Sequence, residues 1–562
     1  MHSSTDSGSQ NRRHWVRQAF KSLGIKSLGL FLLAPMFTAR PAFAADRIYF
    51  AYGALERSIP ISSLENYAKN GKIDRDLADY AQYADAEQLA QLRTVLMARI
   101  PLSHVAVSQF LYTSQGEAVL DRLGQVIQTE ARQPGFYALR AALILGADQP
   151  EGLTLLNVLR KFPTRSIRID VSRSLELARV LEALVTQTQK TIAAVDRQAA
   201  AEATSDPQVD FTQLPDLRKR GRLTWKKQAV ALTDRSRNRI FPVDLYLPQG
   251  GSQRYPIIVI SHGVGSDRST FAYLAEHLAS YGFMVAVPEH PGSNAKQLTA
   301  LLNGKANEVA EPSEFIDRPL DVKYLLDYLA SAQDDPMFQG KLNLEQVGVI
   351  GQSFGAYTAL ALAGAPIDFQ HLQKSCNYNN ETFNISLLLQ CRALELVPPR
   401  SSLHDPRVKA VIALNPPISG ILGQESLSQI KIPVLIGAGS ADTIAPALPE
   451  QIQPFTWLTT PNRYFALIEG ATHFSTLAEA PSGSAPVALP LQVIGPNPAL
   501  ARRYLVALSV AFCETYVANR PDYRPYLSAA YAKSITQSPL TFSLMRSFTA
   551  SQLKEAITGS VQ

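Results

Sequence analysis

The chain has 562 residues, of which 46% are hydrophobic and 8% aromatic, so it is long enough to bury a large core in two or three domains. Its net charge of +6 is concentrated at the start: residues 1–44 carry six Lys or Arg and one Asp, a net of +5, which leaves +1 for the rest. This distribution excludes a broad basic surface for nucleic acid.

The basic leader is followed by an apolar run over residues 28–37 and then by Ala42-Phe43-Ala44, with small residues at the two positions that a signal peptidase reads. We therefore expect residues 1–44 to be a cleaved secretory signal and the mature protein to be periplasmic or secreted. The alternatives are an uncleaved anchor helix, although the run is short for a membrane span, and a twin-arginine signal at Arg12-Arg13.

Residues 45–195 repeat apolar side chains at spacings of three and four, for example Leu89, Leu92 and Leu96, which is the pattern of one face of a helix. We expect a smaller all-α N-terminal domain here. The segment has one histidine, His104, and no cluster of catalytic side chains. Residues 196–221 lose the periodicity and are rich in Ala, Asp, Gln and Pro, which predicts a linker.

From residue 222 onward, short apolar segments alternate with helical ones. Two strands of a β-meander are expected first, and then single strands, at residues 223–234, 239–248, 255–261, 283–290, 346–351, 408–417, 432–439 and 463–470. Helices are expected at residues 270–281, 317–331 and 499–517. This alternation predicts an α/β fold with a mostly parallel sheet covered by helices on both faces, over residues 222–520, followed by a helical C-terminal extension at 521–562.

An insertion at about residues 366–407 separates two of the expected strands, in the right place for a lid over the carboxyl ends of the strands. It contains Cys376 and Cys391, which could form a disulfide in an oxidising compartment; alternatively, these two and Cys513 are all buried thiols. No Cys/His spacing in the sequence indicates a zinc site, and we expect neither a metal nor a cofactor.

A candidate nucleophile lies in "VGVIGQSFGAYTALALAGA", residues 347–365. A Gly-x-Ser-x-Gly motif is weak evidence alone, because a chain of this length can contain one by chance. Here the motif follows an apolar strand and opens a helix, which is the context of a nucleophile elbow, so Ser353 is the expected nucleophile.

A serine hydroxyl needs a base to take its proton, and the base needs an acid to orient it. Three histidines follow Ser353 in the chain, and two of them, His371 and His404, fall in or beside the insertion. His473 in "IEGATHFS" comes directly after the last expected strand and is therefore the expected base.

The expected acid is Asp442 in "GAGSADTIAP", which comes just after the preceding strand; a helix-capping role is its alternative. Asp405 and Glu450 are the spare candidates.

The tetrahedral oxyanion of ester cleavage needs backbone N–H donors, one from the residue after the nucleophile and one from the loop after an earlier strand. Phe354 and Val264, in "ISHGVGSDRS", are the expected donors. We expect His262 in the same loop to be structural rather than a second base.

The segments "SHGVGSDRSTFAYLAEHLASYGFMVAVPEHPG", "VGVIGQSFGAYTA" and "GATHF" resemble the platelet-activating-factor acetylhydrolase branch of the α/β-hydrolase superfamily over residues 222–480. The segments "LIGAGSADTIAP" and "GATHF" are equally similar to bacterial cutinases and polyester hydrolases, whose acid matches Asp442. The acetylhydrolase acid matches Asn415 instead, and an amide cannot supply its negative charge, which favours Asp442.

Residues 46–190 resemble an uncharacterised domain that precedes the hydrolase in certain predicted exported bacterial hydrolases, which implies architecture and no activity.

Together these features predict an exported serine hydrolase that cleaves carboxylic esters, of a short-chain lipid or phospholipid type, through an acyl-enzyme. The alternatives are a cutinase-type or aryl-ester hydrolase, an acyltransferase, and a non-catalytic protein that binds through its helical domain. The expected partner is a small-molecule ester or lipid, with lipid-surface contact as an option and no nucleic acid; the oligomeric state stays open. Phe354 and Trp457 are candidates to line an acyl site or are ordinary core residues.

Overall fold

The computed structural model describes residues 44–250, 254–377, 384–478 and 491–559. The signal expected at residues 1–44 therefore lies almost wholly outside the described residues. Within them, no helix is both long and apolar enough to cross a membrane.

The N-terminal domain contains a four-stranded sheet, so the prediction of an all-α domain was wrong. The strands are β1 (Arg47–Tyr52), β2 (Leu55–Pro60), β3 (Ile127–Thr129) and β4 (Ser166–Asp170), in the order β2-β1-β4-β3. The helices around them are α1 (Ile61–Asn70), α2 (Arg75–Ala81), α3 (Ala86–Met97), α4 (His104–Leu111), α5 (Ser114–Val126), α6 (Phe136–Ala147) and α7 (Leu155–Arg160). The central pair, β1 and β4, is parallel and joins segments more than a hundred residues apart, which local periodicity does not reveal.

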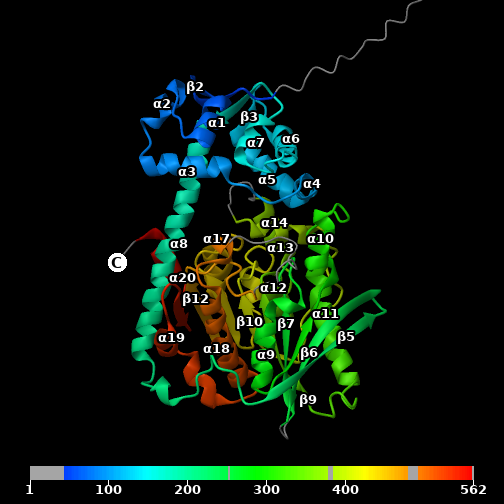
Figure 1. Cartoon of the computed structure of the whole chain (residues 1–562). Coiled ribbons are helices and arrows are strands. Elements are labelled where there is room, and N and C mark those ends of the chain that lie inside the picture. Colours follow the sequence, from blue (N-terminus) through cyan, green and yellow to red (C-terminus); the bar gives the residue numbers. More distant parts are fainter. Residues whose placement is uncertain (1–43, 251–253, 378–383, 479–490, 560–562) are drawn as a thin grey trace, which may run out of the picture. The chain divides into compact units, whose positions relative to one another are not determined.

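Helix α8 (Val171–Ser205) continues through the first ten residues of the predicted linker, which corrects that boundary. Its second half packs against the C-terminal helices α19 (Ala529–Ile535) and α20 (Ala550–Thr558), and Figure 1 shows both beside it. The Glu202 carboxylate accepts the backbone N–H groups of Arg546 and Ser547. Residues 196–205 are therefore part of the folded structure.

The larger sheet has nine strands in the order β13-β12-β11-β10-β9-β7-β8-β6-β5. They are β5 (Thr224–Asp234), β6 (Arg239–Gln249), β7 (Tyr255–Ser261), β8 (Met284–Pro288), β9 (Leu342–Gln352), β10 (Val408–Leu414), β11 (Val434–Gly439), β12 (Arg463–Glu469) and β13 (Thr541–Met545). The six strands from β12 to β8 in this order are parallel, and the pairs β12–β13, β8–β6 and β6–β5 are antiparallel. Strand β13 lies in the segment expected to be a helical extension, so that expectation was wrong there and the larger sheet ends well beyond residue 520.

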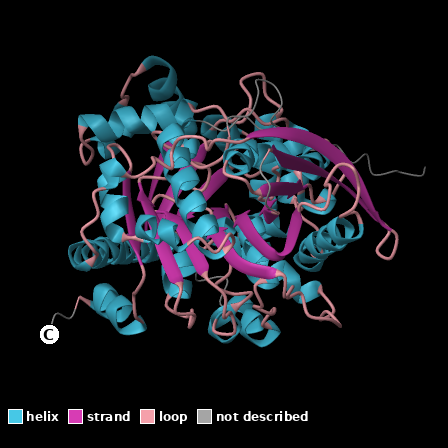
Figure 2. Cartoon of the chain, turned by 90° about the horizontal axis from the view of Figure 1, so that it is seen from below, coloured by secondary structure: helices cyan, strands magenta, loops and turns pink. Residues whose placement is uncertain are grey.

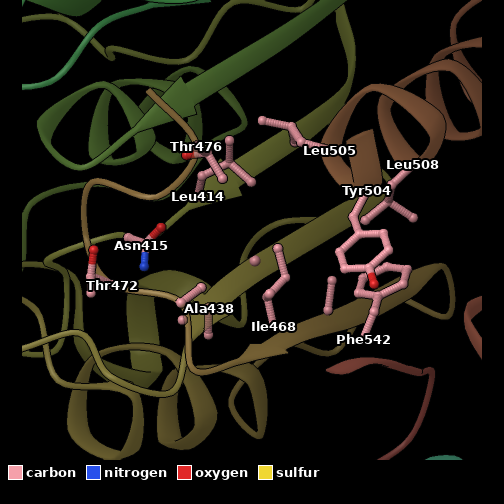
Figure 3. Close-up of a pocket in the computed structure, with 14 residues that line it drawn as sticks. Leu414, Asn415, Ala438, Ile468, Thr472, Thr476, Tyr504, Leu505, Leu508 and Phe542 are labelled. Carbon is pink, nitrogen blue, oxygen red and sulfur yellow. The ribbon is translucent and has the colours of Figure 1, made fainter. Parts of the chain in front are cut away.

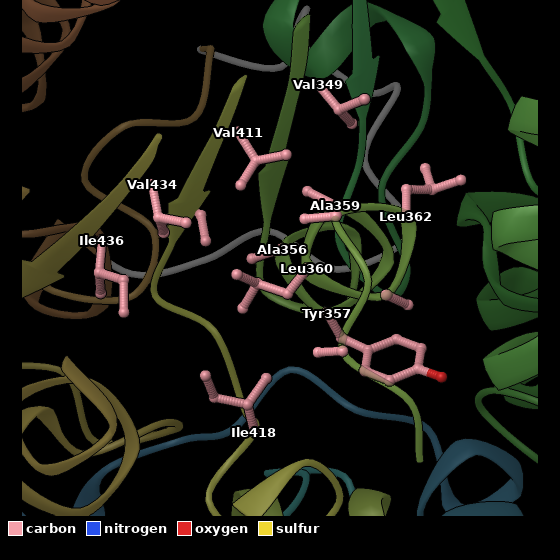
Figure 4. Close-up of a cluster of buried hydrophobic side chains, with 14 of the residues drawn as sticks. Val349, Ala356, Tyr357, Ala359, Leu360, Leu362, Val411, Ile418, Val434 and Ile436 are labelled. Carbon is pink, nitrogen blue, oxygen red and sulfur yellow. The ribbon is translucent and has the colours of Figure 1, made fainter. Parts of the chain in front are cut away.

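Helices cover both faces of this sheet (Figure 2), as its sequence predicted. Along β7, Ile257 and Val259 belong to one buried cluster, and the alternating Ile258 and Ile260 belong to another. The first cluster includes α11 (Glu314–Ser331) and α12 (Phe354–Leu362), and the second includes α9 (Ala272–Ser280) and α18 (Pro498–Tyr516). Figure 4 shows how Ala356, Leu360 and neighbouring side chains of α12 lie against the strands. All nine residues of α12 are buried, which fixes the helix that follows the candidate nucleophile.

The insertion forms α13 (Phe369–Asn377), α14 (Ser386–Gln390) and a 3-10 helix at Cys391–Glu395, with a disulfide between Cys376 and Cys391. Cys513 is a buried free thiol. The remaining α-helices are α10 (Ala295–Leu302), α15 (Gly423–Leu427), α16 (Gln453–Phe455) and α17 (Leu491–Ile494).

Candidate active site

Ser353 lies on a sharp turn between β9 and α12. Its backbone has φ 55° and ψ −121°, which is unusual for a residue with a side chain and costs on the order of 1–3 kcal/mol. The Ser353 N–H donates to the Leu414 carbonyl at 2.8 Å, so the neighbouring strand β10 holds the turn in place. The geometry is that of a nucleophile elbow.

The two glycines of the motif are required by close packing of the backbone. A Cβ at Gly351 would lie 1.9 Å from the Gly355 carbonyl oxygen, and a Cβ at Gly355 would lie 2.0 Å from the Ser261 carbonyl oxygen. Neither backbone atom can move aside without breaking the turn or the end of β7. The spacing Gly-x-Ser-x-Gly is therefore explained by this turn.

His473 and Asp442 form a buried pair at the carboxyl ends of β12 and β11. The His473 Nδ1 atom lies 2.7 Å from Asp442 Oδ2, and the Asp442 side chain is fully buried. Because a carboxylate accepts hydrogen bonds, the proton of the neutral ring belongs on Nδ1. The His473 Nε2 atom makes no hydrogen bond with any described residue, and it is left as the acceptor.

Asp442 is held by donors on both oxygens. Oδ1 accepts the N–H groups of Ile444 and Ala445 at 2.9 and 2.8 Å. Oδ2 accepts the Asn415 side-chain amide at 2.8 Å in addition to His473. Asn415 lies at the end of β10 with φ 47°, at one end of a small apolar pocket (Figure 3). The sequence places Asn415 at the position that matches the acetylhydrolase acid, and only the structure shows that its amide donates to Asp442.

Gln352 links the turn at Ser353 to the loop of His473. Its side-chain amide donates to the His473 carbonyl oxygen at 3.1 Å, and the glutamine is buried. A direct hydrogen bond between Ser353 Oγ and His473 Nε2 is not formed between these two described residues. In catalytic sites this bond often shortens only when substrate binds.

The backbone amides of Val264 and Phe354 are free to bind an oxyanion. Phe354 is the first residue of α12, where N–H groups lack partners within the helix. Among the described residues, neither amide donates a hydrogen bond. The Phe354 ring, in contrast, is buried against Phe315 and Tyr357, so it belongs to the core and not to an acyl site.

The other candidate residues lie in different surroundings. Asp405 pairs with Arg407, and the His371 ring bonds to the Ser419 carbonyl. His404 is exposed. Trp457 is partly buried against the larger core cluster.

The spare acid Glu450 instead fastens the insertion to the loop after β10. Glu450 is fully buried. Its carboxylate accepts side-chain hydrogen bonds from three residues of the insertion, Asn384, Ser386 and Gln390. It also accepts the backbone N–H groups of Ile418 and Ser419 in the loop.

His262 is structural. It is fully buried, and its Nε2 accepts the His290 backbone N–H at 3.1 Å, so its own proton lies on Nδ1, 2.7 Å from the Gly263 carbonyl. Burial, together with the charge of Arg318, holds the pKa of His262 well below its usual range. The described residues contain no group of three or more His, Cys, Asp or Glu side chains arranged to hold a metal ion.

Two family models match the chain. The family described as "alpha/beta hydrolase of unknown function" matches residues 44–170, and "platelet-activating factor acetylhydrolase, isoform II" matches residues 242–324. The chain has the α/β-hydrolase fold. The first match falls on the N-terminal domain, and the second runs from β6 into α11, so it includes the loop of Val264 and stops before Ser353.

The chain is also similar to mammalian platelet-activating factor acetylhydrolases. It is 26% identical to the Cavia porcellus protein over 142 residues, which is 20% of this chain and 33% of the relative. It is 24% identical to the Canis lupus familiaris protein over 151 residues, which is 21% of this chain and 34% of the relative. The chain thus spans about a third of the length of these two curated relatives.

Proposed function

We propose that this α/β hydrolase is an exported serine hydrolase of carboxylic esters, with Ser353 as nucleophile, His473 as base and Asp442 as the acid that orients it. The single observation that carries the proposal is the buried 2.7 Å contact between His473 and Asp442, on the same sheet edge as a serine in a strained turn. A strained, positive φ at a non-glycine residue persists only where the surroundings enforce it, and such sites cluster at active centres.

In the proposed reaction, Ser353 Oγ attacks the ester carbonyl while His473 Nε2 takes the hydroxyl proton. The amides of Val264 and Phe354 stabilise the tetrahedral oxyanion. His473 then returns the proton to the leaving alcohol, which produces an acyl-enzyme. Water hydrolyses that ester with His473 as base again. Asp442 keeps the imidazole in the Nδ1–H tautomer and stabilises its cationic form.

The proposed substrate is a lipid or phospholipid-type ester with a short acyl chain. The similarity to platelet-activating factor acetylhydrolases supports this class. A cutinase-type activity on polyesters or aryl esters is the second candidate, because the acid follows β11 at Asp442 and an amide follows β10 at Asn415.

The test uses purified protein from residue 45 onward and p-nitrophenyl esters of two to sixteen carbons, phospholipid vesicles with short acyl chains, and a soluble polyester. We expect turnover that is lost in Ser353→Ala, which also prevents labelling by a fluorophosphonate probe. Preference for short-chain phospholipid over polyester supports the first substrate class, and the reverse supports the second. Labelling with no hydrolysis but with transfer to an added alcohol indicates an acyltransferase. Full activity of Ser353→Ala rejects the mechanism.

The export proposal rests on the basic and apolar leader in residues 1–44, and the disulfide between Cys376 and Cys391 supports it because such bonds persist in oxidising compartments. Cell fractionation of the full chain, followed by N-terminal sequencing of the mature form, tests it. We expect a mature N-terminus near residue 45 in the periplasm or medium, and a cytosolic protein that retains residue 1 rejects it.

A further inference from the structure

A buried arginine, Arg318, lies directly behind the proposed oxyanion site. It is on α11, and its side chain is completely buried. Its Nη1 donates to the His262 carbonyl at 2.6 Å and its Nη2 to the Gly263 carbonyl at 3.5 Å. Its guanidinium also lies over the Phe354 ring, 4.5 Å from the ring centre. One side chain therefore contacts the backbone of the loop that carries one proposed donor and the side chain of the residue that carries the other.

The contact of Arg318 with the Gly263 carbonyl affects the Val264 amide, which is one of the two proposed oxyanion donors. The Gly263 carbonyl and the Val264 N–H belong to the same peptide unit, so a cation at the carbonyl polarises the unit and makes the N–H a stronger donor. The Arg318 side chain is completely buried, so its positive charge acts through a low local dielectric. Lysine could not replace these contacts, because only the planar guanidinium donates to two carbonyls while it stacks on a ring.

The surroundings keep Arg318 charged and in position. Its Nε donates to Ser293 Oγ at 2.9 Å and lies 3.6 Å from a Glu314 oxygen. Burial lowers the pKa of Arg318 to about 10, against the opposing effect of Glu314, so the side chain remains a cation at neutral pH.

Pro319, the residue after Arg318, allows a hydrogen bond between α11 and α12. Proline has no N–H, so the Phe315 carbonyl one turn earlier loses its helical partner, and the Tyr357 hydroxyl of α12 donates to that carbonyl at 2.8 Å. This bond ties α11 to the helix that begins at the nucleophile turn.

We propose that Arg318 is a positioning residue for ester cleavage: it fixes the loop of Val264 and the ring of Phe354 so that both amides converge, and its charge strengthens the hole for the oxyanion. The proposal rests on the proposed function of Ser353.

Arg239 supplies a matched control. It belongs to the same charge cluster, where it pairs with Asp321 at 2.8 Å and with Glu314 at 2.8 Å, and it makes no hydrogen bond to the residues of the oxyanion loop. Arg239→Met therefore removes one positive charge from the cluster and Arg239→Lys retains it, as the same substitutions at Arg318 do, and neither variant touches the loop.

The experiment measures kcat and KM on p-nitrophenyl butyrate, with the concentration of competent enzyme taken from the burst amplitude. We expect kcat/KM to fall about tenfold in Arg318→Lys and on the order of 10² in Arg318→Met, mainly through kcat, because loss of an oxyanion donor costs 10²–10³. Affinity for an alkyl trifluoromethyl ketone, whose adduct carries an oxyanion, should fall in parallel. The Arg239 variants should stay within about threefold of the wild type in both measurements.

Equal losses in the Arg318 and Arg239 variants would overturn the proposal, as would Arg318→Met with unchanged kcat. If Arg318→Met does not fold, the two lysine variants decide alone, because they retain the charge. Ser353→Ala separates the two hypotheses: if it retains activity, the proposed function fails; if it is inactive while Arg318 and Arg239 behave alike, only the role of Arg318 fails.

Discussion

Serine, histidine and aspartate come together twice in this protein, once at Ser353, His473 and Asp442, and once at three residues in the interior. In the interior set, Ser261 Oγ lies 3.0 Å from His290 Nε2, and His290 Nδ1 lies 2.9 Å from Asp321 Oδ2. The interior set thus has all of its hydrogen bonds formed, whereas the Ser353 set lacks the bond between hydroxyl and imidazole. Completeness of the hydrogen bonds does not identify the reactive set.

Access and backbone conformation separate the two sets. The three interior side chains are completely buried, with 0% exposure at Ser261, while Ser353 is 9% exposed and has a positive φ. Ser261 ends a regular strand, so its hydroxyl points into the packed interior network and no substrate carbonyl reaches it.

The charges around the two acids differ as well. Asp321 is shared with Arg237 and Arg239 at 2.8 Å, so its negative charge is already balanced by two cations. Burial and the charge of Arg318 hold the pKa of His290 well below its usual range, which makes it a poor base. Among the described residues, Asp442 ion-pairs with His473 alone, so its charge is available to stabilise an imidazolium.

The largest contrast is expected between the two serines. Ser353→Ala should lower kcat by about 10⁶, because it removes the proposed nucleophile. Ser261→Ala should keep kcat within about tenfold and lower the free energy of unfolding by about 1–3 kcal/mol, because the buried His290 Nε2 loses its partner. Ester turnover and urea unfolding measure the two effects. A fluorophosphonate that labels Ser353→Ala but not Ser261→Ala would reverse the assignment.

The two aspartates should differ as the two serines do, with a loss of activity at Asp442 and a loss of stability at Asp321. Asp442→Asn should lower kcat on the order of 10⁴, the size of effect seen when a triad acid elsewhere becomes an amide, with little change in stability. Asp321→Asn should cost about 3–5 kcal/mol of stability, because it leaves two arginines without their buried partner. Thermal unfolding and kcat are measured for both variants. Equal loss of activity per folded molecule would remove the distinction between the two sets.

The two acids also differ in their neighbours: Asp442 accepts a hydrogen bond from the neutral amide of Asn415, whereas Asp321 is paired with two arginines. Asn415→Ala should lower kcat/KM about tenfold at every pH, since a hydrogen bond to a charged group is lost. Asn415→Asp should place a second carboxylate against Asp442 Oδ2, and the two would share a proton, which raises the pKa of the pair. The acidic limb of the kcat/KM profile should then move to higher pH in Asn415→Asp only. Identical profiles for the two variants would show that Asn415 merely fills space.

The sequence was sufficient for the parts of this comparison that depend on order along the chain. The apolar strands, the motif around Ser353 and the positions of Asp442 and His473 after successive strands are local features, and the structure brings Asp442 and His473 into contact. Their catalytic roles remain a proposal.

What the sequence did not reveal depends on contacts between distant segments. β13 pairs with β12 from more than seventy residues away, and β1 pairs with β4 across most of the N-terminal domain. Arg318 and the interior set carry no motif at all, because their partners come from β7, α11 and the loops after β7 and β8. Only the fold shows that a buried arginine adjoins the nucleophile turn.

The smallest expected effect is a dependence of stability on pH that comes from two buried histidines, His290 of the interior set and His262 of the loop after β7. The folded-state pKa values of His262 and His290 are lowered, so each ring stays neutral in the folded protein while it binds a proton in the unfolded chain below about pH 6.5. The unfolded state then holds more protons, and stability falls as the pH falls below that value, by about 1.4 kcal/mol per pH unit for each histidine. Above pH 6.5 this contribution is fully present. Urea unfolding from pH 5 to 8 gives the free energy of unfolding as a function of pH. Below pH 6.5 the slope of this plot should be smaller in His290→Gln by the contribution of one proton. The exposed control His404→Gln should leave the slope unchanged. If His290→Gln kept the wild-type slope, the interior histidine would already be charged in the folded protein, and the electrostatic difference between the two sets would disappear.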